Sequence, residues 1–294
     1  MGTQRIEEAD AMIHLAENRY GKSRVRLVRV NRQSPVHELQ EWSVEVLLQG
    51  DFLSCFAEGD NSKILPTDTM KNTVYSLARD SSAGCMEDFS KELLEYLLAR
   101  NPQVSEAEVS IHEKAWQHLT TGGTPHPGTF VQAGSELQTT RAARKRGEKF
   151  RVESGIEDLL IVKTTGSAFE GYLKDSLTTL RETSDRLFGT ALRARWNYVS
   201  ADSPFASLRG TIRESLLVAF AEHQSKSVQH TLYAMAESAL AAATQISEIT
   251  LTMPNKHYLL VDLTRFGQDN PNYIFVPTDE PHGTIEARIC RRSE

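Results

Sequence analysis

The chain has 294 residues, of which 39% are hydrophobic and 24% charged, and its formal net charge at pH 7 is −6. A chain of this length can bury about three quarters of its unfolded surface, so it needs neither disulfides nor metal ions to hold a core. The acidic balance argues against nucleic acid as the main partner. A small anionic ligand would therefore depend on a local basic pocket and not on the charge of the whole protein.

Cysteine usage and the two ends of the chain favour a cytoplasmic protein. The cysteines are three in number and show no CxxC spacing, which is typical of reduced thiols: Cys55, Cys85 and Cys290. Residues 1–20 carry several charges and no apolar run, unlike a secretory signal, and no stretch approaches the about 18 apolar residues of a membrane span. The last residues, 291–294, lack the Ser-Lys-Leu peroxisomal signal. We therefore expect a cytoplasmic location and no membrane partner.

The first half of the chain predicts two strands, two helices and a further strand, at 24–30, 36–49, about 70–79, about 86–100 and 103–117. Charged and apolar residues alternate from Arg24, which is typical of a half-buried strand. The alternation slips by one at Leu27-Val28, which indicates a bulge there or a strand buried partly on both faces. In the second helix, Phe89, Leu93 and Leu97 share one face.

The second half repeats this order. Strands are predicted at 158–164 and 192–200, a helix begins at Ser203-Pro204, a second helix carries Val228, and strands follow at about 248–253, 257–265, 273–277 and 283–291. The sequence thus predicts an α+β fold in which a strand-strand-helix-helix-strand-strand unit occurs twice.

Between the halves, residues 119–150 are rich in Thr and Gly and then in basic side chains. We interpret them as a long connection, with the first domain at 1–150 and the second at 151–294. The basic run from Arg141 to Arg151 would suit a phosphate-binding patch or a solvated linker. The linker is favoured because no aromatic residues are interleaved with the charges.

Two such units leave sheet edges open. If the helices cover one face of each sheet, the other face must be polar or be buried by something else. Exposed edge strands also invite pairing with a further copy. We therefore expect a closed oligomer.

Common cofactor and metal motifs are missing. The sequence shows no P-loop, dinucleotide fingerprint, HExxH or GxSxG, and Thr164-Thr165-Gly166-Ser167 lacks the spacing and the lysine of a phosphate loop. The nine histidines are scattered without metal-ligand spacing. We expect no cofactor and no metal.

Seven short strings are more specific than these general patterns. In chain order they are Tyr20-Gly21-Lys22, Thr67-Asp68-Thr69 running into Lys71-Asn72-Thr73-Val74-Tyr75, Phe169 with Gly171, Thr178-Thr179-Leu180 with Arg186, Val228-Gln229, Met253-Pro254-Asn255-Lys256-His257 and Phe266-Gly267-Gln268-Asp269-Asn270-Pro271-Asn272. In this order and at these separations, the set resembles urate oxidase from about residue 15 to 290. The resemblance implies two tandem tunnelling-fold (T-fold) domains and a homotetramer around a tunnel. It also implies a cofactor-independent reaction of urate with O2 that gives 5-hydroxyisourate and H2O2 in purine degradation.

The resemblance assigns a flat binding pocket for the planar purine. Phe169 would stack under the ring, and Leu180 and Val228 would form the apolar wall. Arg186 presents a rigid fork of donors, and Gln229 has both a donor and an acceptor, so the two could grip the edges of urate. Judged alone, Phe169 would more often be a core residue and Arg186 a solvated one.

The resemblance also assigns a proton relay of Lys22, Thr67 and His257. The Thr67 hydroxyl would take a proton from urate, Lys22 would keep that hydroxyl basic, and His257 would pass charge onward. Asn255 would hold oxygen above the purine, and Asp68 would be a further contact. Two of these residues have a plain alternative: Lys22 would be a solvated lysine, and Thr67 would cap the following helix.

In the family the relay lysine and threonine and the aspartate come from one subunit, and the stacking phenylalanine, arginine, glutamine, asparagine and histidine come from its neighbour. The site on this chain would then form only in the oligomer. Ile285 is a plausible outer contact.

Two other classes share parts of this pattern. A zinc-dependent T-fold enzyme, such as a cyclohydrolase or pterin synthase, would need clustered His and Cys ligands that the sequence lacks. A non-catalytic purine-binding protein would be expected to keep the binding residues and lose the relay, whereas both sets are present here.

Overall fold

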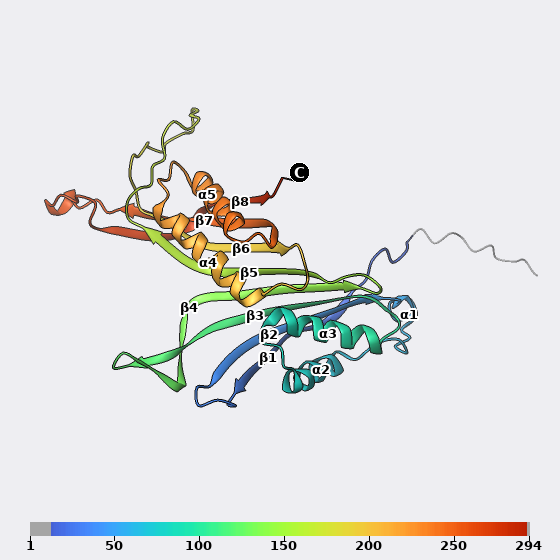
Figure 1. Cartoon of the computed structure of the whole chain (residues 1–294). Coiled ribbons are helices and arrows are strands. Elements are labelled where there is room, and N and C mark those ends of the chain that lie inside the picture. The colour runs from blue at the N-terminus through green and yellow to red at the C-terminus, as the bar shows by residue number, and fades with distance from the viewer. Residues whose placement is uncertain (1–12, 293–294) are drawn as a thin grey trace, which may run out of the picture.

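The computed structural model describes residues 13–292, and these form an eight-stranded antiparallel sheet (Figure 1). Each strand pairs with the next one along the chain. The strands are β1 Tyr20–Asn31, β2 Glu38–Gly50, β3 Val104–Thr121, β4 Thr124–Lys145, β5 Arg151–Lys163, β6 Phe188–Tyr198, β7 Ile246–Leu260 and β8 Phe275–Cys290. The consecutive order leaves β1 and β8 as the edges of the sheet.

The helices fall into two groups that occupy equivalent places in the two halves. Three lie between β2 and β3: α1 Leu53–Glu58, α2 Thr67–Asp80 and α3 Met86–Arg100; two lie between β6 and β7: α4 Phe205–Glu222 and α5 Val228–Ala242. A short 3-10 helix, η1 Thr264–Phe266, lies in the β7–β8 connection. The predicted α+β fold, with its doubled order, is confirmed. None of the helices within residues 13–292 is long and apolar enough to cross a membrane.

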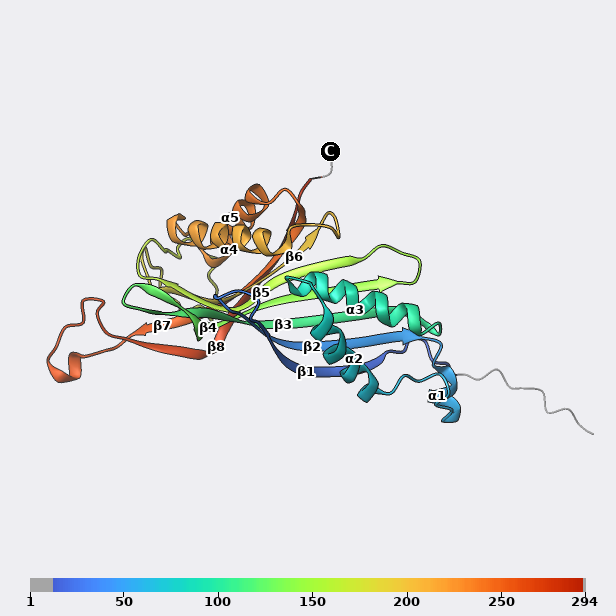
Figure 2. The ribbon, with the colours of Figure 1, turned by 60° about the horizontal axis from the view of Figure 1, so that its bottom comes forward.

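Both helix layers cover the same face of the sheet (Figure 2). The register shows why, because one row of paired residues crosses six strands and is buried throughout: Val44, Ile111, Thr140, Ser154, Trp196 and Ile249. Side chains two positions apart point to the same face of a strand. A single apolar face therefore extends through both halves.

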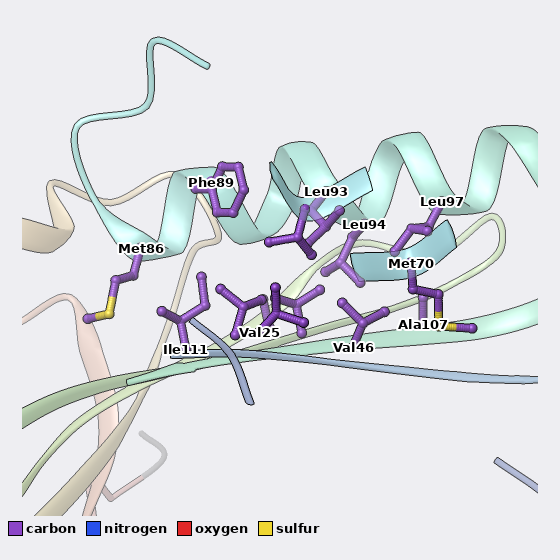
Figure 3. Packing of buried hydrophobic residues seen from close by; sticks show 14 of the residues in the cluster. Val25, Val46, Met70, Met86, Phe89, Leu93, Leu94, Leu97, Ala107 and Ile111 are labelled. Carbon is purple, nitrogen blue, oxygen red and sulfur yellow. The ribbon is translucent and has the colours of Figure 1, made fainter. Parts of the chain in front are cut away.

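Each half has its own hydrophobic cluster on that face. In the first, Phe89, Leu93 and Leu97 of α3 are buried against strand residues such as Val46, as the i, i+4 spacing predicts (Figure 3). In the second, α4 and α5 pack over Trp196 and its neighbours. Burial of a large apolar side chain contributes about 1.5–3 kcal/mol, so these two clusters hold the helices on the sheet.

The opposite face of the sheet is charged. Arg141 on β4 pairs with Glu108 on β3 at 2.6 Å, and Lys114 on β3 pairs with Glu41 on β2 at 2.7 Å. Further along, Asn197 donates to a carboxylate on β7. The face that the helices do not cover is therefore polar, which is one of the two alternatives that the sequence left open for it.

The prediction of a long connection at 119–150 is wrong. Strands β3 and β4 pair almost to their tips, from Glu106–Lys145 to Thr121–Thr124. The turn between them uses Gly122 and Gly123, whose positive φ angles of 58° and 81° suit glycine. The Thr- and Gly-rich residues thus form the tip of a hairpin. Near the middle of the chain, strands β4 and β5 are separated only by the turn at 146–150.

The basic run at 141–151 is not a solvated linker either. Arg141 and Arg151 lie on strands and pair with Glu108 and Glu106 of β3. Arg146 donates to the carbonyl groups of Leu98, Asn101 and Val104, and so satisfies the C-terminal end of α3. Three of the basic side chains, Arg141, Arg146 and Arg151, are thus paired within the fold.

Smaller differences concern bulges and merged strands. The irregularity in β1 lies between Lys22 and Val25, where Arg24 has a φ of 57°, and not at Leu27-Val28. The four predicted C-terminal strands form only two strands, β7 and β8. A further irregularity in their pairing lies between Asn255 and His257 of β7. The division into domains 1–150 and 151–294 stays a prediction, because the sheet continues through this point from β4 to β5.

A buried ion pair joins the two halves on the helix side. Glu87 of α3 is 0% exposed and Arg209 of α4 is 5% exposed, and the Arg209 guanidinium donates to the Glu87 carboxylate. Ser154 of β5 also donates to Glu87, and Arg209 reaches Gln138 of β4 at 2.8 Å. Burial, together with the nearby Glu87 charge, raises the pKa of Tyr198 to about 12. The junction of the halves is therefore a polar network inside an apolar layer.

Replacing Glu87 with Ala should lower the free energy of unfolding by about 3–5 kcal/mol, because Arg209 would keep its charge in a buried place without its partner. Chemical denaturation measures this directly. The matched control is Glu95→Ala on the same helix: Glu95 is 61% exposed, and its pair with Arg144 at 3.5 Å should be worth less than about 1 kcal/mol. Equal losses in the two variants would contradict this role of the buried pair.

Candidate active site

Lys22, Thr67 and Asp68 come from neighbouring elements in the first half. Lys22 lies on β1 just before its bulge, α2 packs against β1, and Thr67 is the first residue of α2. The side chain of Lys71 donates to the Asp68 carboxylate and is the main cause of its lowered pKa, to which the charge of Lys22 also contributes. The structure thus brings these three predicted residues together.

The plain alternative for Thr67, helix capping, is not what the structure has. Pro66 occupies the N-cap position, and α2 has no side-chain cap there. Both Thr67 and Lys22 are half-buried. The Thr67 hydroxyl is therefore not used as the N-cap of this helix.

The approach to Thr67 is held by a residue that the sequence analysis did not single out as functional. The Tyr20 hydroxyl accepts from the Leu65 amide at 2.8 Å and donates to the Leu65 carbonyl at 3.2 Å. Tyr20 lies two residues before Lys22, and Leu65 two before Thr67. These two hydrogen bonds therefore fix the distance between the strand and the start of the helix.

Phe169 and Arg186 lie on the segment 164–187 between β5 and β6. The backbone of Phe169 pairs with Thr183 through hydrogen bonds of 2.8 and 3.1 Å, which places the two ends of the segment side by side. The Arg186 guanidinium carbon lies 5.5 Å from the centre of the Phe169 ring, and Tyr172 stacks on that ring at 4.8 Å. Aromatic platform and planar donor are thus adjacent.

The surroundings of the Arg186 guanidinium suit a residue that donates hydrogen bonds to a ligand. Burial lowers its pKa, and its Nε is buried with no hydrogen-bond partner. A buried donor without a partner costs about 1–3 kcal/mol, so a ligand that accepts from it gains that amount back. Arg186 also lines a surface cavity of about 490 Å³, together with Tyr258 and Phe275.

Val228 and Gln229 are the first residues of α5. The Ser227 hydroxyl caps this helix by accepting from the His230 amide at 3.1 Å. Val228 is buried, Gln229 is exposed, and the amide of the first helical residue has no partner within the helix. The side chain of Gln229 and the N–H of Val228 are both available to a ligand.

Asn255 and His257 flank the irregularity in β7 and are both half-buried. Asn255 lies opposite Thr190 on β6 and Gly283 on β8, and the hydroxyl of Thr278 on β8 lies 3.5 Å from the His257 carbonyl oxygen. An irregular register at this point changes which way successive side chains face.

Two predicted residues are placed less favourably in a single chain. Leu180 is 60% exposed, so it forms no closed apolar wall within this protomer. Ile285 packs against the second hydrophobic cluster. Both remain predictions as ligand contacts.

A single chain does not bring the relay together. Lys22 and Thr67 lie at the β1 edge, whereas His257 is on β7, and five strands separate the two (Figure 1). Six inter-strand steps amount to roughly 29 Å along a sheet. The candidate site therefore consists of two separate groups of residues at opposite ends of the protomer.

The described part of the chain offers no ready metal site: residues 13–292 contain no group of three or more His, Cys, Asp or Glu side chains that could hold a metal ion. All three cysteines are free.

The doubled ββααββ order in one antiparallel sheet, with helices on one face, defines a T-fold protein. A family model described as Uricase matches residues 18–143 and 152–286. The chain is 39% identical to the uricase of Arthrobacter globiformis over 94% of this chain and 90% of that one, and 36% identical to that of Dictyostelium discoideum over 95% and 98%. The chain belongs to the uricase family.

Solved structures agree with this assignment. The crystal structure of the Arthrobacter globiformis uricase superposes with a TM-score of 0.91, at 38% identity and with 97% of each chain covered. A urate oxidase from Bacillus sp. TB-90 gives a TM-score of 0.83 at 21% identity, covering 94% of this chain and all of the other. At this level of identity the similarity supports only the fold.

Tyr20→Phe should lower the free energy of unfolding by about 1 kcal/mol, because it removes both hydrogen bonds to Leu65. It should also speed amide hydrogen exchange at Leu65. Tyr75→Phe is the control, since Tyr75 is 43% exposed on α2. Unchanged exchange at Leu65 would show that Tyr20 does not hold this segment.

Proposed function

We propose that the protein is a urate oxidase that converts urate, O2 and water into 5-hydroxyisourate and H2O2 in purine degradation, without metal or organic cofactor. The proposal rests mainly on Arg186, whose buried Nε lacks a partner while its guanidinium lies beside the Phe169 ring. This is an arrangement for a flat, edge-accepting ligand. The free thiols of this chain suit a cytoplasmic location.

Urate would lie on Phe169 with its edges bound by Arg186 and Gln229. Arginine can donate two parallel hydrogen bonds to acceptors on one edge, and its charge compensates that of the anion. Gln229 and the amide of Val228 begin α5, where the positive end of the helix also favours an anion. Leu180 would complete the apolar wall.

Proton removal from urate is assigned to Lys22, Thr67 and His257. The doubly deprotonated form of urate gives up electrons most readily, so the site needs a base next to the ring. Thr67 is half-buried and does not cap α2; Asp68 follows it on the same helix, and Lys22 lies on the neighbouring strand β1. Asn255 would hold O2 above the purine. Two electrons pass from urate to O2, which becomes H2O2, and water supplies the hydroxyl group of the product.

The complete site would form between two copies of the chain in a homotetramer. The relay residues of the first half and the binding residues of the second lie at opposite ends of the protomer, so each must meet its counterpart from another copy. The open edges β1 and β8 support this proposal, because an unpaired strand edge can continue a sheet into a second chain.

Protein dialysed against a chelator should still consume urate, with one O2 taken up per urate, as followed by ultraviolet absorbance and an oxygen electrode. No metal is asked to take part in the proposed chemistry, so chelation should not change kcat. Loss of activity that added metal restores would contradict cofactor independence. Binding of urate without turnover would instead favour a non-catalytic purine-binding protein.

Two inactive variants should restore activity when mixed. Lys22→Met should lower kcat by about 100-fold or more, and Arg186→Ala should raise KM steeply, because one removes proton transfer and the other removes ground-state binding. Random co-assembly should place the two variants together in half of the subunit pairs. In each mixed pair, one of the two shared sites has both halves intact, so about a quarter of all sites should recover activity.

The control mixture combines Lys22→Met with Thr67→Ala. Both changes affect the same half of the site, so every site keeps one defect and no activity should return. Equal recovery in both mixtures, or recovery in neither, would contradict a site shared between subunits in this way.

A further inference from the structure

One carboxylate connects the separate segments that carry the proposed urate-binding residues. Asp185 accepts a hydrogen bond from the Thr165 hydroxyl at 2.7 Å and from the Ser167 amide at 3.2 Å. The amides of Gly166 and Arg186 contribute further, and together these donors hold the Asp185 pKa below its usual range. The carboxylate thus ties the beginning of the segment 164–187 to its end.

The contacts of Asp185 lie directly beside Phe169 and Arg186. Arg186 is the next residue in the chain, so its backbone is held by the same carboxylate. Ser167 is two residues before Phe169, whose own backbone pairs with Thr183. The Thr183 hydroxyl donates to the Asp185 carbonyl at 2.8 Å, which closes a small ring of hydrogen bonds. These hydrogen bonds therefore involve the backbone next to or at both Phe169 and Arg186.

The same network extends to the start of α5. Ser225 pairs in parallel with Ser167: its amide donates to the Gly166 carbonyl at 2.9 Å, and its carbonyl accepts from Ala168 at 2.8 Å. The Ser225 hydroxyl donates to the carbonyl of Ser227, which is the N-cap of α5. The positions of Val228 and Gln229 are therefore linked to the loop that Asp185 holds.

Asp185 is unsuited to touch an anionic ligand itself. Its negative charge would repel urate at short range, although four donors surround it. Its geometry instead fixes where other groups stand, and small displacements of binding groups are costly in an active site.

We propose that Asp185 is a positioning residue for urate binding, which sets the mutual placement of Phe169, Arg186 and the first turn of α5. The identity of the ligand in this inference rests on the proposed function, whereas the role of Asp185 in holding the backbone does not. Asp185→Ala should raise both the KM for urate and the Kd for urate measured under nitrogen by about tenfold or more, with kcat changed much less. Without O2 the oxidation cannot proceed, so binding is seen alone.

Two further variants separate positioning from general damage. Asp185→Asn keeps the shape and can still accept from the Ser167 amide, so it should return KM to within about threefold of the original value. Asp175→Ala is the matched control: Asp175 lies in the same segment, but its side chain accepts only locally, from Leu177 and Thr178. That variant should leave KM and Kd unchanged.

Amide hydrogen exchange gives a readout that does not depend on urate. In Asp185→Ala, exchange should speed up at 166–169, 183–186 and 225–230, and in Asp175→Ala these segments should keep their original rates. Unchanged exchange at 225–230, or an unchanged KM in an active Asp185→Ala enzyme, would overturn the proposal. If the unaltered protein neither binds nor oxidises urate while the exchange pattern appears as expected, the proposed function fails and the positioning network stands.

Discussion

The consecutive order of eight antiparallel strands is the constraint on which the rest of the structure depends. It makes one open sheet whose edges, β1 and β8, lie as far apart as the fold allows. Lys22 belongs to one edge strand, and Asn255 and His257 belong to the strand next to the other edge. A single chain keeps these two groups of residues apart, and in the proposed oligomer a second copy would bring them together. Edge pairing and catalysis would then have the same origin, because whatever satisfies the open edges also joins the two groups of residues.

Strict alternation along the strands gives this sheet two very different faces. The buried row through Ile111, Ser154 and Trp196 carries the helices, whereas the neighbouring positions carry paired charges such as Arg141 and Glu108. The buried face is continuous across the middle of the chain, and the Glu87–Arg209 pair links the helix layers above it. The two halves therefore share one continuous packed layer, which would support a site divided between distant strands as proposed.

The sequence predicts regular elements well where periodicity is strong, as for α3 with Phe89, Leu93 and Leu97. It fails at 119–150, since the prolines and glycines there suggest a connection, and only the partner strand β3 shows that they belong to a long hairpin. The candidate site residues could be proposed because their short strings are distinctive, and their roles stay predictions. Their surroundings could not, because Phe169 and Thr165, which contact Arg186 and Asp185, lie about 20 residues earlier in the chain, and such contacts leave no periodic pattern in the sequence.

The placement of the proposed binding residues explains why so much support surrounds them. Lys22, Asn255 and His257 lie on strands, whereas Phe169 and Arg186 lie on an irregular segment with exposed apolar side chains, among them Leu173 at 95% exposure. Such side chains favour being covered by another surface. In the proposed site this segment would both meet a second subunit and hold a planar ligand, so it would need internal hydrogen bonds of its own. The hydrogen bonds that the Asp185 carboxylate accepts would supply those ties within one chain, so the proposed assembly would only have to bring together halves that are already shaped.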